Sequence, residues 1–532
     1  MSDLYGLLPP CFAPTNHRRE RSRRLFITHF SYVLFMKTYL FTAVALLGAS
    51  TLFAQENRAI NQQTGNGNKQ NFQQKGNQNQ LSIQQNGNEN SSSFWQYGLQ
   101  NNAVLRMTAG DRNTINIVQN GLNNTGMSNQ AEVEVWGNDN SGIFSQYGNQ
   151  NFIYFNMRGT GGSGQPFTGA SRTNTSSVFV GQSGDLNTIS GGLEGDGNQA
   201  YLYQSGSRNR LGSGYDAQGA YAIGNNNYMY NAQLGSDNQQ VIQQTGDQNQ
   251  HTGFQIGDRN TGSIVQTGDQ NYNYNYSLGN DNTVSVEQIG NENRGVFTQF
   301  GNTNQQSLAQ TGNGNYASSY QQGNENVASM TQTGNDNDVI VYQAGNVNQQ
   351  SLAQVGDGNY AINHQRGNDN QASFTQTGNT NRIDNLSYTF GVFYQIGDRN
   401  VKNVTQTGDN NQAAVSQRGS DNQQTATQTG NANILLNTQY GDGNLAVLTQ
   451  TGNRNTSIIG QTGDGNRATT TQTGDDNTIT FERVDPVPGI GNNFVGQFGD
   501  NNVFEMSQSG NGNFVQFMQV GNGNSIIGTQ AP

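Results

Sequence analysis

A repeat of eleven residues governs this sequence and constrains its fold more than any other feature. The unit is Gln-x-Gly-(Asn/Asp)-x-Asn followed by five variable residues, and thirty-seven units can be counted when the less regular ones are included. Between residues 224 and 378, fifteen glycines follow one another at intervals of eleven without a slip. Asn stands three residues after each of them, and Gln stands nine residues after every glycine that begins a complete unit there, except Gly268. A fixed period indicates a repeat architecture in which each unit packs on its neighbours.

The residues between two glycines alternate in character with a period of two. The third and ninth residues after the glycine are Asn and Gln, and the fifth and seventh are often small or apolar, as with Ala328 and Met330. This alternation predicts a strand of about seven residues with one buried face. The Gly-(Asn/Asp)-x corner contains residue types that tolerate positive φ, so we expect a tight turn there.

Two strands that face each other would close one coil of twenty-two residues. Thr407, Thr429, Thr451 and Thr473 recur at that interval. The sequence therefore predicts an all-β, amyloid-like β-solenoid of about 18 coils, a rod on the order of 90 Å long. Stacked coils would place Asn over Asn and Gln over Gln about 4.8 Å apart. Hydrogen bonds between these amides would satisfy a polar interior that is otherwise costly to desolvate.

Particular residues follow from this arrangement. The predicted structural ladder is represented by Asn227, Gln233, Asn238, Gln244, Asn326, Gln332, Asn337, Gln343, Asn370, Gln376, Asn411, Gln417, Asn455 and Gln461. The predicted turn glycines are represented by Gly224, Gly235, Gly246, Gly323, Gly334, Gly345, Gly408 and Gly452.

The composition indicates a polar core. Of 532 residues, 31% are hydrophobic and 11% are charged, whereas a soluble globular chain is about half apolar and about a quarter charged. An ordinary multidomain enzyme is therefore disfavoured. Disorder is disfavoured too, because it usually accompanies high charge and frequent proline, and the chain has only 7 prolines. The formal net charge of −11 argues against a nucleic-acid partner, because acidic surfaces repel phosphate.

The first 54 residues differ from the rest and are expected to be removed. From Met36, an apolar stretch between Leu40 and Leu47 follows Lys37, and Ala54 ends a sequence suited to cleavage. The pattern predicts a secretory signal peptide at 36–54, cleaved after Ala54, with 1–35 an over-extended start. The only cysteine, Cys11, lies in this part. Neither disulfides nor thiolate metal sites are therefore expected in the mature chain.

The repeats are expected to be interrupted by insertions. We predict repeats at 55–151, an insertion at 152–183, repeats at 184–206, an insertion at 207–223, regular repeats at 224–381, an insertion at 382–396, repeats at 397–477, an insertion at 478–498 and terminal repeats at 499–532. Pro166, Pro486 and Pro488 all fall in the insertions. Their positions suit a chain whose regular units are strands, because proline interrupts a strand ladder.

Candidates for chemistry are weak in this sequence. Gly159, Gly161 and Gly164 match a dinucleotide-binding string, but no helical pattern follows them. The many Gly-Asn-Gly-Asn strings lack the carboxylates of calcium-binding repeats. His251 falls on an inward position and is expected to occupy a polar core site rather than to bind metal. No catalytic residue, cofactor or metal is therefore predicted, and the protein is not expected to be an enzyme.

The repeat also resembles a known family. A predicted signal peptide followed by tandem Ser/Asn-x5-Gln-x-Gly-x-x-Asn-x5-Gln units is similar to curlin, the subunit family of bacterial curli fibres. Residues 326–343 carry this match most clearly, and the pattern covers most of residues 61–524. The resemblance implies export through a curli-type outer-membrane secretion pore. It also implies polymerisation with related repeat subunits into extracellular or cell-surface amyloid fibres for cell adhesion and biofilm. This chain has more repeats than curlin, carries insertions, and has Asn where the family has Ser.

Two functions are open at this point. A solenoid has two open strand edges, and the apolar final units at 503–518 and 525–527 carry no evident cap. The favoured hypothesis is a secreted structural protein that adds copies of itself end to end. The alternative is a monomeric β-solenoid surface adhesin or an ice- or glycan-binding protein. Its basis is the threonine column, which Ile289 and Val355 interrupt, and the tyrosines at 271–276.

Overall fold

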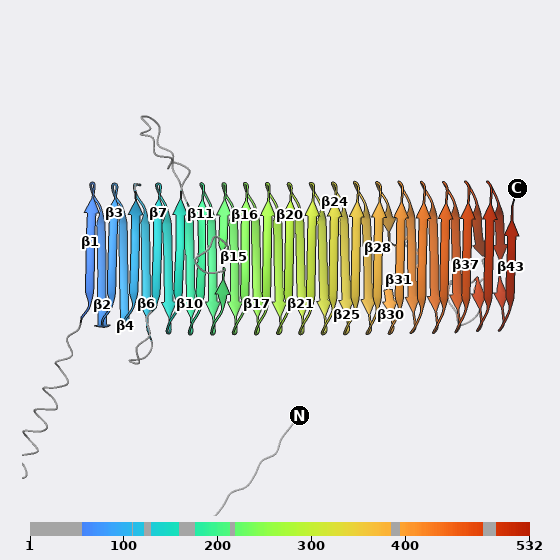
Figure 1. Cartoon of the computed structure of the whole chain (residues 1–532), viewed down its shortest axis with the longest axis horizontal. Helices are drawn as coiled ribbons and strands as arrows, with labels where there is room; N and C mark the ends of the chain where they lie inside the picture. The colour runs from blue at the N-terminus through green and yellow to red at the C-terminus, as the bar shows by residue number, and fades with distance from the viewer. Residues whose placement is uncertain are drawn as a thin grey trace, which may run out of the picture. The chain divides into compact units, whose positions relative to one another are not determined.

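The protein is a stack of strands in two parallel sheets. The computed structural model describes residues 56–108, 110–121, 129–158, 176–212, 219–384, 394–481 and 496–531. From Glu56 onward these residues form one compact unit (Figure 1). They contain strands and turns, and among them no helix exists that could cross a membrane. The chain alternates between the two sheets, which we call sheet A and sheet B.

Sheet A comprises β1 (Arg58–Thr64), β3 (Gln80–Asn86), β5 (Asn102–Thr108), β7 (Gln130–Trp136), β9 (Phe152–Arg158), β11 (Thr188–Glu194), β13 (Arg210–Leu211), β14 (Ala220–Ile223), β16 (Gln239–Thr245), β18 (Thr261–Thr267), β20 (Thr283–Ile289), β22 (Gln305–Thr311), β24 (Val327–Thr333), β26 (Gln349–Val355), β28 (Gln371–Thr377), β31 (Val401–Thr407), β33 (Gln423–Thr429), β35 (Leu445–Thr451), β37 (Arg467–Thr473), β40 (Val503–Ser509) and β43 (Ser525–Gln530).

Sheet B comprises β2 (Lys69–Asn77), β4 (Ser91–Leu99), β6 (Thr114–Asn120), β8 (Ser141–Tyr147), β10 (Ser177–Ser183), β12 (Gln199–Ser205), β15 (Tyr228–Leu234), β17 (Gln250–Ile256), β19 (Tyr272–Leu278), β21 (Arg294–Phe300), β23 (Tyr316–Gln322), β25 (Asp338–Ala344), β27 (Tyr360–Arg366), β29 (Arg382–Ile383), β30 (Tyr394–Ile396), β32 (Gln412–Arg418), β34 (Ile434–Tyr440), β36 (Thr456–Thr462), β38 (Thr478–Phe481), β39 (Gln497–Phe498), β41 (Phe514–Phe517) and β42 (Gln519–Val520).

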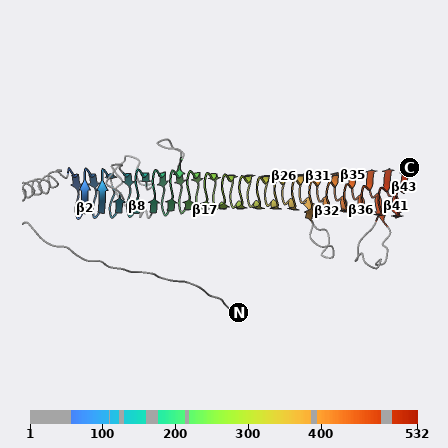
Figure 2. The ribbon, with the colours of Figure 1, turned by 90° about the horizontal axis from the view of Figure 1, so that it is seen from below.

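The register repeats every coil. In the regular part of the stack each strand pairs in parallel with the strand twenty-two residues further along, as Gln305 does with Val327 between β22 and β24. Figure 2 shows the two sheets as two layers joined by the turns. The predicted β-solenoid is therefore confirmed, with about 19 turns of about 22 residues.

The predicted alternation of buried and exposed residues is present in the strands. In β24, Ala328, Met330 and Gln332 are buried, and the residues between them face outward. Apolar side chains at the fifth and seventh positions of successive coils, such as Leu308, Met330 and Leu352, form the middle of the core. Each such side chain, when fully buried, stabilises the fold by about 1.5–3 kcal/mol. The core is thus an apolar stripe between columns of amides.

The turns are tight, but the positive φ angles are distributed differently from the prediction. The glycine has φ near 110°, and the second residue after it has φ near 57°, as in Gly334 (119°) and Asp336 (55°). The intervening Asn or Asp has no positive φ. Glycine is needed for a further reason, because a Cβ at Gly334 would lie 2.0 Å from the carbonyl oxygen of Gly356 in the next coil. The turns therefore stack as closely as the strands.

The predicted insertion ranges are too wide, because they contain strands. Within 152–183, β9 and β10 each pair along their whole length with strands of the stack. In 207–223, 382–396 and 478–498, pairs of short strands share one position: β13 with β14, β29 with β30, and β38 with β39. In these ranges extra residues, inserted in a turn or within a strand, break the spacing of eleven in the sequence. The residues on either side of each insertion still pair with the neighbouring coils in the same register.

Candidate functional site

The glutamines form hydrogen-bonded ladders inside both sheets. In sheet A the ladder is interrupted between Gln85 and Gln244, where the glutamine position is occupied by Met107, Val135, Met157, Leu193 and Ala222. In sheet B it is interrupted at Ser277. Gln310 Nε2 donates to Gln332 Oε1 (2.8 Å), and Gln332 Nε2 donates in turn to Gln354 Oε1 (3.0 Å). Gln332 Nε2 also donates to the backbone oxygen of Tyr316 (3.0 Å), which ties the ladder to the opposite sheet. Each glutamine donates toward the C-terminal end of the stack. The glutamine side chain thus fills the core and also links neighbouring coils by hydrogen bonds.

The asparagines form a second ladder that runs the other way. The backbone nitrogen and Nδ2 of Asn337 both donate to Asn315 Oδ1 of the preceding coil, at 3.1 and 3.0 Å. Nδ2 also donates to the oxygen of Gly356 (2.7 Å), which fixes the turn of the following coil. The hydrogen bonds from one side-chain amide to the next therefore run in opposite directions along the stack in the two ladders. Fully paired amides remove the desolvation cost that a polar core would otherwise carry.

The residues predicted for the ladder lie in these two columns. All fourteen are at most 1% exposed. The seven glutamines among them donate to the next glutamine of their column, and the seven asparagines donate to the Oδ1 of the preceding asparagine. The eight predicted turn glycines have φ between 105° and 120°. Ala54, the predicted cleavage residue, and Gly159, Gly161 and Gly164 lie outside the described residues.

A third column, at the turns, was not predicted from the sequence. The Asn or Asp that follows each glycine accepts a hydrogen bond from the backbone of the preceding coil: Asn335 N donates to Asp357 Oδ1 (2.7 Å), and Asp357 N donates to Asn379 Oδ1 (2.8 Å). Asn and Asp both have an Oδ1 atom that can accept this hydrogen bond, which explains why either residue can occupy the position. This position is mostly Asn or Asp, whereas the next residue varies freely. That restriction is the sequence signal that could have revealed the column.

His251 lies inside the stack, on the inward position assigned to it. The ring is fully buried, and it lies between Gln240 Nε2 (3.1 Å from His251 Nε2) and Asn273 Oδ1 (3.0 Å from His251 Nδ1). The Asn273 oxygen only accepts, so the proton resides on Nδ1. Burial lowers the pKa of His251 to about 4. The imidazole is therefore a neutral core residue at physiological pH.

Lys402 is a buried amine that sequence reasoning missed. It occupies an inward position of β31 and is 1% exposed. Its Nζ donates to Asn363 Oδ1 (3.1 Å) and lies 5.7 Å from the centre of the Phe374 ring. Burial lowers the pKa of Lys402 to about 7. A basic residue at the fifth position after Gly397 is the sequence signal that marks it.

The outer face of sheet B carries a column of neighbouring rings, tilted against one another except for the stacked pair Tyr320 and Tyr342. Seven successive strand positions contribute one ring each, with centroids 4.9–6.0 Å apart. This aromatic column consists of Tyr230, Phe254, Tyr276, Phe300, Tyr320, Tyr342 and His364. Aromatic pairs of this kind contribute about 0.5–1.5 kcal/mol each beyond the area they bury. The column thus stabilises the stack from outside.

The outer face of sheet A has a different chemistry. Over β31, β33, β35 and β37 it presents two in-register columns of threonine, formed by Thr405, Thr407, Thr427, Thr429, Thr449, Thr451, Thr471 and Thr473. Ile289 and Val355 lie in the same column nearer the N-terminus, as the sequence indicates. The two outer faces of the solenoid therefore differ in chemistry: sheet A presents threonine and sheet B presents aromatic rings.

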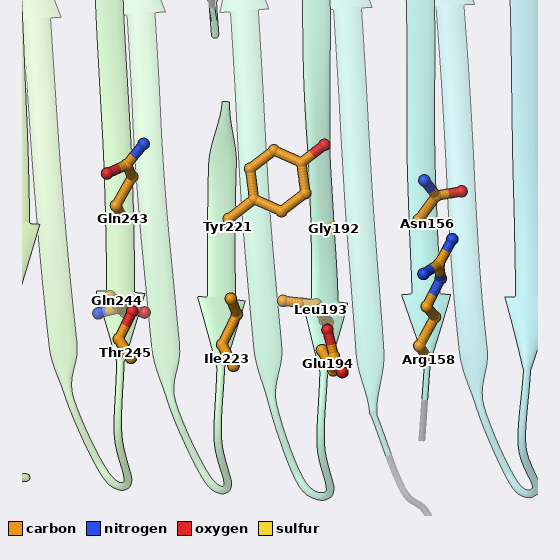
Figure 3. A pocket seen from close by; sticks show the side chains of 10 residues that line it. All are labelled: Asn156, Arg158, Gly192, Leu193, Glu194, Tyr221, Ile223, Gln243, Gln244 and Thr245. Atoms are coloured by element: carbon orange, nitrogen blue, oxygen red, sulfur yellow. The ribbon is translucent and has the colours of Figure 1, made fainter. Parts of the chain in front are cut away.

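A hollow of about 460 Å³ lies on the outer face of sheet A, where Gly192 of β11 has no side chain (Figure 3). Arg158, Glu194, Tyr221 and Gln243 surround it. The Arg158 guanidinium also lies 5.8 Å from the centre of the Trp136 ring. The lining contains neither His nor Cys. Among the residues that the structure describes, no group of three or more His, Cys, Asp or Glu could hold a metal ion.

A known family model matches the repeat units of this chain. The model of the curlin associated repeat matches residues 279–312, 307–334 and 438–463. The chain is a curlin-repeat protein. The matched curlin repeats cover β20 to β24 and continue at β35 and β36, and the coils around them keep the same register and the same amide ladders. No curated protein matches the chain in sequence. The family and the solenoid together indicate a structural protein.

Proposed function

We propose that this protein is secreted and polymerises end to end into curli-like amyloid fibres for cell adhesion and biofilm matrix. The observation that carries the proposal is the complementarity of the two ends of the stack. The signal peptide at 36–54 would direct secretion. A curli-type outer-membrane pore would export the chain, and related repeat subunits would join the fibre. The role requires no catalysis and no cofactor.

The C-terminal end offers ladder donors and strand edges. Gln519 and Gln530 are the last members of the two glutamine columns, and each accepts from the glutamine before it. In the interior the next glutamine would accept from their Nε2 groups. The outward edges of β41, β42 and β43 likewise offer backbone groups, and no later strand is described that pairs with them. An open strand edge is a template for another chain.

The N-terminal end offers the matching partners. Gln63 and Gln74 begin the glutamine columns, and each donates to the glutamine of the next coil. Their Oε1 atoms take the place of the acceptors that Gln519 and Gln530 need. The asparagine columns have the opposite sense, so Asn57 and Asn68 provide donors at this end. Donors at one end therefore meet acceptors at the other, as within the stack.

The proposal is tested on purified residues 55–532. We expect fibres with cross-β reflections at about 4.7–4.8 Å and about 10 Å, and growth that preformed fibre ends accelerate. Ile527→Pro, on the open edge of β43, should slow elongation because proline removes a ladder donor, while Ile527→Ala should not. Persistent monomer over a wide range of concentrations would contradict the proposal.

A second candidate is binding to ice or another regular surface by the monomer. The observation that favours it is the pair of threonine columns over β31 to β37, which presents one hydroxyl-bearing side chain type at a regular spacing. Thermal hysteresis by the monomer, lost in Thr427→Lys, would support it. The aromatic column makes glycan binding the corresponding alternative for sheet B, and a saturable binding isotherm would be its measurement.

A further inference from the structure

Taking end-to-end polymerisation as the proposed function, we infer that each copy in the fibre is rotated by half a turn about the fibre axis relative to the copy before it. The partner at the junction is a second copy of this chain. The inference rests on the number of strand positions, which is odd, and on the pairing that each possible junction would allow.

The first and last strands of the stack that the structure describes, β1 and β43, both belong to sheet A. Sheet A has twenty positions, because β13 and β14 share one of its twenty-one strands' places. Sheet B has nineteen positions, since its twenty-two strands include three pairs that share a place: β29 with β30, β38 with β39, and β41 with β42. The described residues therefore form thirty-nine half-coils, and β1 and β43 lie in the same sheet.

Docking without rotation leaves a gap. If β1 of one copy pairs with β43 of another, sheet A continues, but the next position of sheet B stays empty. The edges of β2 and of β41 and β42 would then lie about 9–10 Å apart, twice the spacing of paired strands. Neither edge could hydrogen-bond across that distance, and both would be enclosed by the junction. Unpaired backbone groups in an enclosed site are strongly unfavourable.

Docking with half a turn leaves no gap. The rotated copy places β1 on β41 and β42, and β2 on β43, so every edge strand gains a partner at the normal spacing. This is possible because the two halves of a coil have the same ladder positions: Gln63 lies over Gln519, and Gln74 over Gln530. The exposed Phe72 of β2 (43% exposed) then lies over Gly528, where the end of the stack has no side chain. A large residue thus meets the smallest one.

The rotation changes what the fibre presents. Sheet A with its threonine columns and sheet B with its aromatic column exchange sides at every junction. Each side of the fibre therefore displays both chemistries in alternation, with an axial period of two copies. One copy is about 94 Å long at about 4.8 Å per coil, so the period is about 188 Å.

Cysteine cross-linking distinguishes the two junctions, because the chain has no cysteine after Cys11. Ile60, Gln516 and Ile527 are each the third residue of an end strand and lie outside the core. The half-turn junction places Ile60 beside Gln516, and the unrotated one places it beside Ile527, at the spacing of adjacent strands, which suits a disulfide. Fibres of Ile60→Cys/Gln516→Cys should give a ladder of disulfide-linked oligomers, while Ile60→Cys/Ile527→Cys and the single variants should not.

The opposite pattern, or fibres in which neither pair cross-links, would overturn the half-turn junction and leave fibre formation standing. Absence of fibres would overturn the proposed function together with the junction. The axial repeat in electron micrographs gives a second measurement: about 188 Å for the full chain. A chain ending at Gly521 has an even number of half-coils and should repeat at about 91 Å, whereas one ending at Gly510 is odd again and should repeat at about 178 Å. Repeats that follow length without this alternation would refute the inference.

Discussion

Replacing Lys402 with methionine should stabilise the protein at neutral and mildly acidic pH. The amine is buried in the stack and makes one hydrogen bond, to Asn363 Oδ1. Burial lowers the pKa of Lys402 from 10.5 to about 7 in the folded chain, and its charge adds to the burial that lowers the pKa of His364. Methionine has a similar length without the charge, so it fills the same space.

The magnitude follows from the pKa difference. A change of about 3.5 units corresponds to about 5 kcal/mol, at about 1.4 kcal/mol per unit. The unfolded chain binds the proton more tightly, so stability is reduced fully below pH 7 and recovers as the pH rises toward 10.5. Methionine also leaves the Asn363 oxygen without its donor, which costs about 1–3 kcal/mol. The net gain is therefore about 2–4 kcal/mol at pH 6.5 and close to zero at pH 9.

The assay is denaturant unfolding of wild type and Lys402→Met at both pH values, with the difference between the two chains as the readout. Comparing differences cancels the titration of groups that the chains share. Lys69→Met, at an exposed position of β2, is the matched control and should leave the pH dependence unchanged. An equal effect of Lys402→Met at pH 6.5 and pH 9 would refute the argument that an uncharged amine is favoured in the core.

The other predictions concern the ladders, the turns and His251. Gly441→Ala should lower the free energy of unfolding by more than about 3 kcal/mol or block folding, because its Cβ would lie 2.1 Å from a backbone oxygen. The control Gly443→Ala has open space around it and should cost about 1 kcal/mol. Equal shifts of the unfolding temperature for the two variants would contradict this. Val347→Gly should raise stability by about 1 kcal/mol in denaturant unfolding, since its φ of 59° suits glycine; a loss would count against strain there. Gln332→Met should cost about 2–4 kcal/mol of stability, because it removes the hydrogen bonds of this side chain to Gln310, Tyr316, Asn337 and Gln354. An unchanged free energy of unfolding would show that the ladder does not stabilise the stack. Titration of His251 should cost wild type about 3 kcal/mol of stability between pH 6.5 and pH 4, because the pKa of His251 is about 4 in the fold and higher when the chain is unfolded. The loss for His251→Asn over this range should be smaller by that amount, and identical acid profiles of the two chains would refute the assignment.

Much of the fold can be derived from the repeat alone. A spacing of eleven with Asn and Gln at fixed positions has few geometric solutions, because alternation with a period of two assigns each side chain to the inside or the outside. That reasoning places Gln332 and Asn337 in the core from their spacing to the glycines. It also accounts for the turn glycines. Each repeat unit determines its own strand, turn and inward side chains, and the repetition of these units fixes the register between coils.

The places where prediction failed are those that depend on contacts between coils. The turn column at Asp357 depends on an acceptor facing the backbone of a different coil, which no single unit reveals. The strand β9 falls within a predicted insertion because it has Met157 where the repeat has Gln, and because Gly159, eleven residues after Gly148, is not followed by Asn three residues later. Its residues nevertheless pair in register. Lys402 escapes sequence reasoning because it occupies a place that is apolar or amide-bearing in most other units.

By itself the sequence determined the period, the strand, the inward amides and hence the solenoid, since all of these arise within one unit and its neighbour. Only the tertiary structure decided the direction of each ladder, the separation of rings and threonines onto opposite faces, and the sheet in which the stack ends. Those properties belong to the sum over many coils, where inserted residues shift the numbering while hydrogen bonds between strands preserve the register.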